Sequence, residues 1–266
     1  MRTRRPAARR GRPAGLRARL GSRADRLLRD LPPGRRLRLR LAWAAVERYA
    51  AGTAGRPLTL LDAGSEEGLL VLELARRHPG WRLVAADLAR EPLRRGLRWA
   101  REEGLDVSFV RLDLTAHLGQ ACYDAVVSLE CLEEVPDDTA ALRAMAGALR
   151  PGGLFVAHLP TDDWRPVLAG AERTWRREAR HGYDADELRA RLDEVGLDVR
   201  EVVRTFRRTT ALAQDVRDRL KRRRRAVQLL LLPVMAAAVR LELAGVAWGA
   251  PRGLFVVAVR RPGAAG

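Results

Sequence analysis

The segment from Leu60 to Gly68 constrains the fold of this chain more than any other. A short apolar run ends in Asp62, glycines stand at positions 64 and 68, and apolar residues then continue at helical spacing to Arg77. This pattern is typical of a strand, a tight loop and a helix N-terminus, and glycine at such a turn lets the backbone approach a ligand closely. The fingerprint of dinucleotide-binding proteins needs a third glycine, so the loop does not indicate NAD binding.

Strand-like and helix-like segments alternate along the chain from residue 58 onward. This alternation predicts an α/β fold with a mostly parallel sheet. We expect strands at 58–62, 82–86, 107–111, 123–128, 153–158, 199–206 and 254–259. We expect helices at 67–77, 91–102, 138–149 and 185–194.

The composition divides the chain into five parts. The first residues are rich in arginine, proline and alanine without periodicity, which predicts disorder. Leucines at helical spacing then predict a helix over 16–31 and a second over 36–51, separated by Pro32-Pro33-Gly34. The expected parts are a basic disordered tail (1–15), N-terminal helices (16–56), an α/β core (57–206), a helical insertion with basic and apolar segments (207–252), and a last strand with a tail (253–266).

The formal charge of +17 is concentrated in two segments. Residues 1–40 carry +13 and residues 217–225 carry +6, which leaves −2 for the rest of the chain. The expected core is therefore nearly neutral, and a nucleic-acid-binding surface would have to lie outside it. The two cysteines, Cys122 and Cys131, lack metal-ligand spacing, so we expect a reducing compartment, no disulfide framework and no metal site.

Four further motifs follow the glycine loop in a consistent order. Asp87 ends the second expected strand, and Asp113 follows the third. Residues 123–137 form an apolar run followed by acids and a proline, and the turn 149–153 (Leu-Arg-Pro-Gly-Gly) precedes the fifth strand. Together with the loop, these motifs resemble the class I S-adenosylmethionine (SAM)-dependent methyltransferases, in particular the small-molecule group called methyltransferase type 11.

The resemblance covers about residues 58–206 and implies a Rossmann-like fold. We expect a seven-stranded, mostly parallel sheet with helices on both faces, an antiparallel strand 7, and a helical insertion between strands 6 and 7. The cofactor implied is SAM, which would bind at the carboxyl ends of the strands. The cofactor-binding residues implied are Asp62, Gly64, Ser65, Gly68, Asp87, Leu88, Asp113, Leu114 and Ser128.

Chemistry suggests a role for several members of this set. A carboxylate accepts hydrogen bonds only, which suits Asp87 to the two ribose hydroxyls that the family binds at this place. By the same resemblance, Asp113 would meet the adenine amino group, and Asp62 would position the amino-acid end of the cofactor. Leu88 and Leu114 would lie against the adenine ring.

Two positions depart from the family pattern. Glu66 stands where the family has glycine, so its side chain either points outward or crowds the cofactor. Glu134 stands where many relatives have histidine, and it is one candidate general base beside His158, His181 and Tyr183. A sulfonium methyl group is already activated, so positioning a nucleophile in line does most of the work and no base needs to be assigned.

The sequence pattern of the insertion predicts either a membrane contact or a packed helical hairpin. Strand 6 runs parallel to the first five, so residues 208–250 would start and finish at the rim of the active site. Residues 217–239 are basic and then apolar, a sequence that suits an element resting on an anionic membrane surface. A helical hairpin packed on the core, with its arginines solvated, explains the same pattern. We therefore expect a cytoplasmic enzyme, peripheral on the inner membrane surface if the first interpretation holds.

Three functions compete at this point. The first is transfer of a methyl group from SAM to oxygen or carbon of a small or amphipathic metabolite. The second is RNA methylation through the two basic segments, which is disfavoured because these segments lack interleaved aromatic residues for base stacking. The third is a non-catalytic protein of the same fold, suggested by Glu66.

Overall fold

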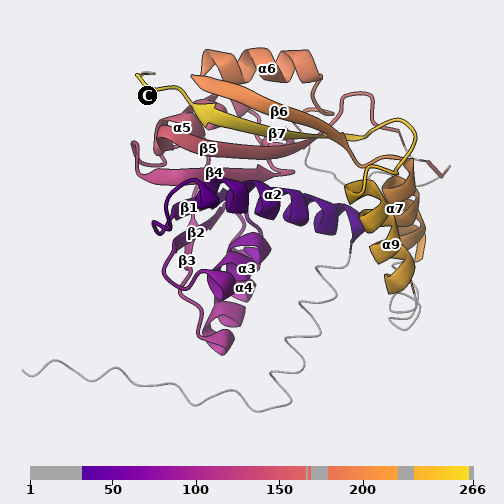
Figure 1. Ribbon diagram of the computed structural model, residues 1–266, viewed down its shortest axis with the longest axis horizontal. Coiled ribbons are helices and arrows are strands. Elements are labelled where there is room, and N and C mark those ends of the chain that lie inside the picture. The colour runs from indigo at the N-terminus through magenta and orange to yellow at the C-terminus, as the bar shows by residue number, and fades with distance from the viewer. Residues whose placement is uncertain (1–31, 166, 169–178, 221–230, 264–266) are drawn as a thin grey trace, which may run out of the picture.

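A seven-stranded sheet forms the centre of the protein, in a computed structural model that describes residues 32–165, 167–168, 179–220 and 231–263 (Figure 1). The strand order is β3-β2-β1-β4-β5-β7-β6, and β7 runs antiparallel to both β5 and β6. The strands are β1 (Thr59–Ala63), β2 (Arg82–Asp87), β3 (Ser108–Arg111), β4 (Tyr123–Leu129), β5 (Leu149–Pro160), β6 (Leu197–Thr205) and β7 (Gly253–Arg260). The Rossmann-like fold expected from the sequence is confirmed.

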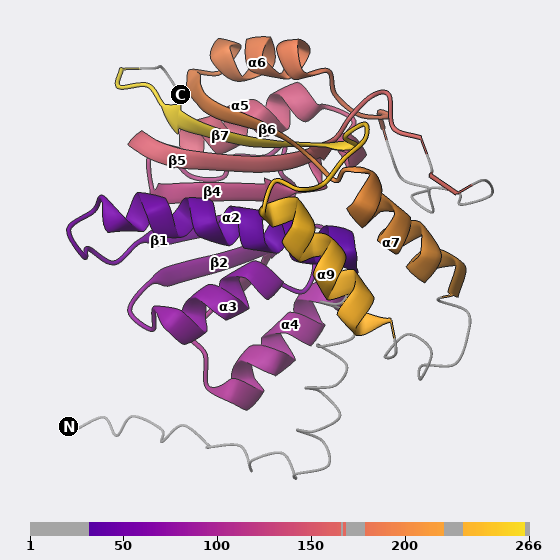
Figure 2. The same cartoon turned by 45° about the vertical axis from the view of Figure 1, so that its right-hand side comes forward.

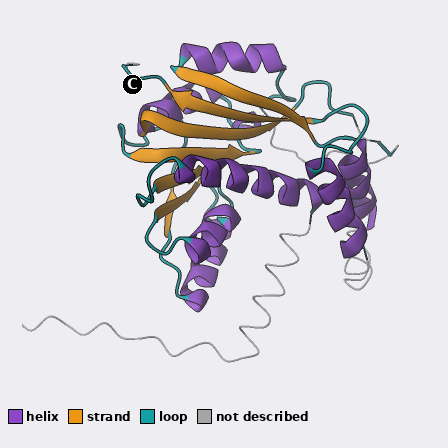
Figure 3. Cartoon of the chain, in the orientation of Figure 1, coloured by secondary structure: helices purple, strands orange, loops and turns teal. Residues whose placement is uncertain are grey.

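Helices cover both faces of this sheet (Figures 2 and 3). One face is covered by α2 (Pro33–Ala51), α3 (Leu69–Arg77) and α4 (Arg90–Glu103), and the other by α5 (Asp138–Ala148) and α6 (Ala185–Glu194). A short 3₁₀ turn, η1 (Leu132–Glu134), follows β4.

Neighbouring residues of the central strands enter two different cores. Leu60 packs in the core under α2, α3 and α4, whereas Leu61 packs in the core under α5 and α6, and both are fully buried. Successive side chains of a strand point to opposite faces, so a strand covered on both sides is apolar throughout. This explains why the central strands read as continuous apolar runs in the sequence.

Most element boundaries differ from the sequence prediction by one or two residues, and two larger differences have an identifiable reason. Helix α2 begins at Pro33 rather than at residue 36, because proline is favoured in the first turn, where its missing N–H is not needed. Strand β5 begins at Leu149 rather than at residue 153. Leu149 pairs with Tyr123, and the ladder continues beyond an irregularity with the pair Ala125 and Leu154.

The insertion between β6 and β7 contains two helices, α7 (Arg208–Leu220) and α9 (Leu232–Leu243). They pack against each other and against the start of α2, at the end of the sheet to which β4 points (Figures 1 and 2). The Gln214 side chain on α7 accepts a hydrogen bond from the N–H of Gly34 at 3.3 Å. The helical insertion that the sequence predicted is therefore present, close to the carboxyl ends of the parallel strands.

Several expectations concern segments outside the described residues. The tail at 1–15, the helix over 16–31 and residues 221–230 of the insertion belong to them. Among the helices that the structure does describe, none has the length and apolar character needed to cross a membrane.

Candidate active site

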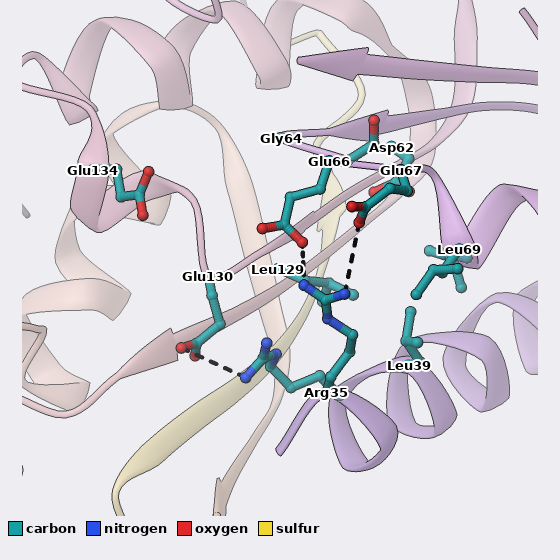
Figure 4. A pocket seen from close by; sticks show the side chains of 13 residues that line it. Arg35, Leu39, Asp62, Gly64, Glu66, Glu67, Leu69, Leu129, Glu130 and Glu134 are labelled. Carbon is teal, nitrogen blue, oxygen red and sulfur yellow. Dashed lines mark hydrogen bonds and ion pairs between the residues drawn. The ribbon is translucent and has the colours of Figure 1, made fainter. Parts of the chain in front are cut away.

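A cavity of about 440 Å³ lies at the carboxyl ends of β1 and β4, beneath the start of α2. Parallel sheets bind ligands at this edge, next to the point where the strand order reverses. Its walls come from the loop after β1 (Asp62, Gly64, Ser65, Glu66, Glu67), from α2 and α3 (Arg35, Arg38, Leu39, Leu69, Leu70), and from the segment after β4 (Leu129, Glu130, Glu134). Figure 4 shows acids and arginines facing one another across it.

The loop after β1 is fixed against the end of β2. The N–H groups of Gly64 and Ser65 both donate to the carbonyl of Ala86, at 2.8 and 2.9 Å. Gly64 has a φ of +79°, and a Cβ there would lie 2.2 Å from the sulfur of Cys131. Only glycine fits this position, so the loop passes the cavity with bare backbone.

Glu66 adopts a backbone conformation that favours glycine, the residue that the family resemblance led us to expect at this position. Its φ is +49°, in the left-handed region that non-glycine residues rarely occupy. Its side chain is 57% exposed and forms an ion pair with Arg35. Glutamate therefore keeps the loop geometry, and an arginine from α2 balances its charge.

Asp87 at the end of β2 is held by backbone donors. The N–H of Glu66 donates to one carboxylate oxygen and the N–H of Ala89 donates to the other, both at 2.7 Å. Each carboxylate oxygen has two lone pairs, so both oxygens keep the capacity to accept a further hydrogen bond.

Asp62 is the most perturbed acid of the cavity. Its side chain is buried, and no residue in the described part of the chain donates a hydrogen bond to its carboxylate. Burial, with the charges of Asp87 and Glu66 nearby, raises its pKa to about 8. The carboxyl is therefore largely protonated at neutral pH, and a cationic ligand beside it would favour the ionised form.

The residues expected near adenine lie beyond the cavity wall. Asp113 follows β3 and accepts hydrogen bonds from the N–H and the hydroxyl of Thr115, at 2.9 and 2.8 Å, and these bonds lower its pKa. Leu88 is 60% exposed, which is unusual for leucine, whereas Leu114 is buried. An exposed leucine beside two strand-end acids leaves an open apolar surface at this end of the site.

Two serines of the expected set carry buried hydroxyls. Within the described residues, neither Ser65 Oγ nor Ser128 Oγ has a hydrogen-bond partner. Buried hydroxyls are normally satisfied, so Ser65, which lines the cavity, is a point where a ligand or a water would gain a bond. Ser128 is buried and is not among the residues that line the cavity. Gly68, the last glycine of the loop, begins α3 with a φ of +68°.

Only one of the four candidate bases lines the cavity, and it is Glu134. His158 is buried behind the wall, and Tyr183 is buried and donates its hydroxyl hydrogen to Asp138 at 2.8 Å. Burial raises the pKa of Tyr183 further above its usual value, with the Asp138 hydrogen bond as the second cause. His181 is exposed in the loop that leads to α6 and is not among the lining residues.

The sequence prediction missed four charged residues that line the cavity. Arg35 pairs with Glu66 and lies 3.6 Å from Glu67, and Arg38 lies 3.7 Å from Glu130. The two arginines stand three residues apart at the start of a helix. This spacing did not distinguish them in the sequence, because the first 40 residues contain 15 arginines.

The cavity suits SAM on features of this structure. Gly64 permits a close backbone approach, Asp62 offers a buried carboxyl beside a cationic ligand, and Arg35 offers a guanidinium for a carboxylate. The buried Ser65 hydroxyl adds an unused polar group on the same loop. These donors and acceptors match a ligand that carries both an ammonium and a carboxylate group.

Comparison with known proteins also indicates a methyltransferase. Residues 34–202 match the model of the methyltransferase domain family. The ubiquinone biosynthesis O-methyltransferase of Cronobacter sakazakii is 32% identical over 176 residues, which cover 62% of this chain and 70% of the relative. The enzyme of the same name from Escherichia coli O9:H4 is 32% identical over 155 residues, or 56% of this chain and 62% of the relative.

Solved structures share the fold at lower sequence identity. A putative sarcosine dimethylglycine methyltransferase from Galdieria sulphuraria has a TM-score of 0.59 and 18% identity, covering 83% of this chain and 84% of that one. The [4+2]-cyclase SpnF has a TM-score of 0.61 and 19% identity, covering 84% and 82%. A cyclase on this fold shows that the fold alone does not fix the reaction. The family match spans more than half of the sequence, and the chain therefore belongs to the SAM-dependent methyltransferases.

Proposed function

We propose that this methyltransferase transfers the methyl group to a hydroxyl oxygen on the ring of a small or amphipathic aromatic metabolite. The observation that carries the proposal is the 32% identity, over 70% of the relative, to a ubiquinone biosynthesis O-methyltransferase. Ubiquinone carries neighbouring methoxy groups on its ring, so an O-methylation on its route acts on a ring hydroxyl. A catechol, with two adjacent hydroxyls, is the acceptor class that we propose for this chain.

The cofactor would be held by the loops at the carboxyl ends of β1, β2 and β3. In this proposal Asp87 accepts from the ribose hydroxyls, and Asp62 and Glu66 face the ammonium group. Arg35 turns from Glu66 to the carboxylate, because a guanidinium binds a carboxylate with paired, charge-assisted hydrogen bonds. Bound SAM supplies a methyl group on a positively charged sulfur, and the residues of the chain orient the acceptor toward it.

The remaining predicted residues would complete the cofactor site. Gly64 and Gly68 keep the loop close to the ligand, and the buried hydroxyl of Ser65 is a polar group on the cavity wall. Ser128, which does not line the cavity, would act from behind its wall. The side chains proposed to surround adenine are Asp113, Leu88 and Leu114.

The charge of the cavity favours an acceptor without a negative charge. Beside the largely protonated Asp62, four further acids line it (Glu66, Glu67, Glu130 and Glu134), against two arginines, Arg35 and Arg38. A carboxylated or phosphorylated acceptor would meet like charges at close range in a partly buried site, which is unfavourable. A neutral hydroxylated ring avoids this repulsion.

The test is a methyl-transfer assay with the full chain, SAM and 4-methylcatechol. We expect S-adenosylhomocysteine and a singly methylated product whose new group is a methoxy group by proton NMR. The control acceptor is 1,2-dimethoxybenzene, which lacks a free hydroxyl and should give no product. A product methylated on a ring carbon, or no turnover with 4-methylcatechol, would contradict the proposal.

We also propose that the helix pair α7–α9 contacts an anionic membrane surface, which would bring an amphipathic acceptor to the cavity. The observation that favours it is a group of large apolar side chains left exposed on and after α9. Val246 is 64% exposed and Trp248 is 59% exposed, and the others are Val234, Leu241 and Leu243. The basic residues Arg217 and Arg219 stand in the last turn of α7. Apolar side chains flanked by bases suit the interface of an anionic bilayer.

Vesicle sedimentation tests this contact. We expect the full chain to pellet with phosphatidylglycerol vesicles and not with phosphatidylcholine vesicles, and the double variant Val246→Ser/Trp248→Ser to lose most of this binding. Val110→Ser on β3 is the matched control, since Val110 is also an exposed apolar residue, 41% exposed, but lies on the far edge strand. Equal binding of the double variant and the control would refute the contact.

A further inference from the structure

Glu130 adopts a strained backbone conformation at the cavity wall. It follows β4, its φ is +54°, and its N–H donates to the carbonyl of His158 at 2.8 Å. Its side chain is 10% exposed and lines the cavity. A non-glycine residue persists in this region only where the surrounding structure holds it, and such residues concentrate at ligand sites.

A buried histidine holds the carboxylate of Glu130 from behind. His158 Nδ1 lies 2.7 Å from Glu130 Oε1, and His158 Nε2 lies 2.8 Å from the hydroxyl of Thr205 on β6. Burial lowers the pKa of His158, so its ring is neutral and carries one N–H. That N–H is at Nδ1 and donates a hydrogen bond to the Glu130 carboxylate, which can only accept. The Thr205 hydroxyl donates a hydrogen bond to Nε2.

A cation approaches the same carboxylate from the opposite side. The guanidinium of Arg38, on α2, lies 3.7 Å from Glu130 Oε2. Glu130 is thus fixed between three elements, β5 with His158, β6 through Thr205, and α2 with Arg38. Figure 4 shows its carboxylate in the cavity, on the same side as Glu134.

We propose that Glu130 is the catalytic residue that takes the proton of the acceptor hydroxyl, and that His158 and Thr205 are positioning residues behind it. The proposal rests on the O-methylation proposed above. As the acceptor oxygen bonds to the methyl carbon, the carbon–sulfur bond breaks and its electron pair stays on sulfur, giving S-adenosylhomocysteine. The hydroxyl proton passes to a carboxylate oxygen of Glu130 and then to water, so charge and atoms balance.

Glu134 offers a competing carboxylate within the same cavity. It stands at the end of the 3₁₀ turn η1, and it is one of the candidate bases expected from the sequence. The structure favours Glu130 because a second strand supplies a neutral donor that holds its carboxylate in place. General bases act through such fixed geometry within hydrogen-bond reach of the proton.

Two catechols of different acidity separate proton transfer from a structural effect. The nitro group of 4-nitrocatechol ionises one hydroxyl near neutral pH, whereas 4-methylcatechol stays protonated and needs a base. We expect Glu130→Gln to lower kcat about 100-fold with 4-methylcatechol, in the range found for general bases, and less than about fivefold with 4-nitrocatechol. Glu134→Gln should change both rates by the same factor. Calorimetry with S-adenosylhomocysteine should give equal affinities for Glu130→Gln and the wild-type chain.

The positioning residues have their own readout. Thr205→Val keeps the shape of the side chain but removes the donor to His158, and we expect kcat for 4-methylcatechol to fall about tenfold with KM unchanged. Thr205→Ser keeps the hydroxyl donor, and we expect its kcat to stay near that of the wild-type chain. The melting temperature of each variant reports whether it is folded.

The outcomes distinguish this inference from the proposed function. A wild-type chain that methylates neither catechol overturns the proposed function and, with it, the role of Glu130. An active wild-type chain whose Glu130→Gln variant loses the same factor with both catechols overturns the role of Glu130 alone. A selective loss in Glu134→Gln would assign the base to Glu134.

Discussion

Asp62 and Asp124 are buried aspartates on adjacent parallel strands, at opposite ends of the sheet. At the amino end of β4, Asp124 accepts from Arg56 and from the N–H of Thr59, both at 2.8 Å, and pairs with Arg150 at 2.7 Å. Burial alone would raise the pKa of Asp124, but these three donors hold it at about 2. At the carboxyl end of β1, Asp62 has no such donor in the described part of the chain, and its pKa rises to about 8.

The opposite pKa shifts identify Asp124 as a structural acid and Asp62 as an acid that a ligand would complete. Asp124 is complete within the protein, because the charges and donors around it satisfy both oxygens. Asp62 has no compensating charge among the described residues, and it lies at the end of the sheet where parallel folds bind ligands. Perturbed acids in a cavity are typical of functional sites, and this pair shows the contrast within one sheet.

The largest expected effect concerns stability at the structural acid. Asp124→Ala removes the acceptor of the Thr59 N–H and the partner of Arg56 and Arg150, which are half-exposed and stay solvated. We expect a loss of about 2–3 kcal/mol in the free energy of unfolding, mainly from the orphaned N–H and the lost charge-assisted hydrogen bonds. Urea denaturation measures it, and affinity for S-adenosylhomocysteine should not change. Asp124→Asn, which keeps an acceptor for Thr59, should lose less. A stable Asp124→Ala variant without ligand affinity would reverse the roles assigned to the two acids.

Asp62→Asn should have the opposite effect on stability. The folded-state pKa of about 8 lies above the usual value of 3.8, so the stability that protonated Asp62 contributes is present at acid pH and lost as the pH rises to about 8. Asparagine does not ionise, and we expect the variant without ligand to gain at least about 1.4 kcal/mol at pH 8, the equivalent of one unit of pKa shift. Its affinity for S-adenosylhomocysteine should fall. Thermal melts of both proteins from acid to pH 8 provide the comparison, and parallel curves would refute it.

Binding of the cofactor product should release a proton from Asp62. An ammonium group beside Asp62 favours its ionised form, so affinity should rise as the pH increases through about 8. Calorimetry of S-adenosylhomocysteine in buffers with different ionisation enthalpies counts the protons released. We expect close to one proton per site at neutral pH for the wild-type chain and none for Asp62→Asn. Proton release that persists in the variant would assign it to another group.

The smallest effect concerns the loop between these acids. Glu66 has a left-handed backbone, which costs a non-glycine residue about 1–2 kcal/mol. Glu66→Gly should therefore be more stable than Glu66→Ala by about 1 kcal/mol, since both variants lose the pair with Arg35 and only alanine keeps a Cβ. Chemical denaturation of the two variants measures the difference, and equal stabilities would show that the loop relaxes.

Much of the fold was predictable from the sequence because it depends on local pattern. Apolar runs at 58–62 and 123–128 predicted central strands, and the acid-glycine order at 62–68 predicted a loop that approaches a ligand. Strand boundaries were less predictable. Leu149 joins β5 only because Tyr123 lies beside it, and that pairing depends on the register of two strands.

The candidate site was predictable only in part. The positions of Asp62, Gly64 and Ser65 in the cavity wall follow from the loop itself. His158 lies near the carboxyl end of β5, close to where the sequence placed it, yet it is buried between Glu130 and Thr205 rather than exposed to an acceptor. Its environment depends on Thr205 of β6, which is 47 residues further along the chain.

The sequence by itself determined the α/β fold and the ends of the strands that carry the loop and its acids, because these depend on periodicity and on the conformational freedom of glycine. Only the tertiary structure decided which charges face one another. The start of α2 and the helix pair α7–α9 meet across 180 residues at Gly34 and Gln214, beside the arginines that close the cavity. Charge pairing across such distances depends on packing, and packing is fixed only when the whole chain has folded.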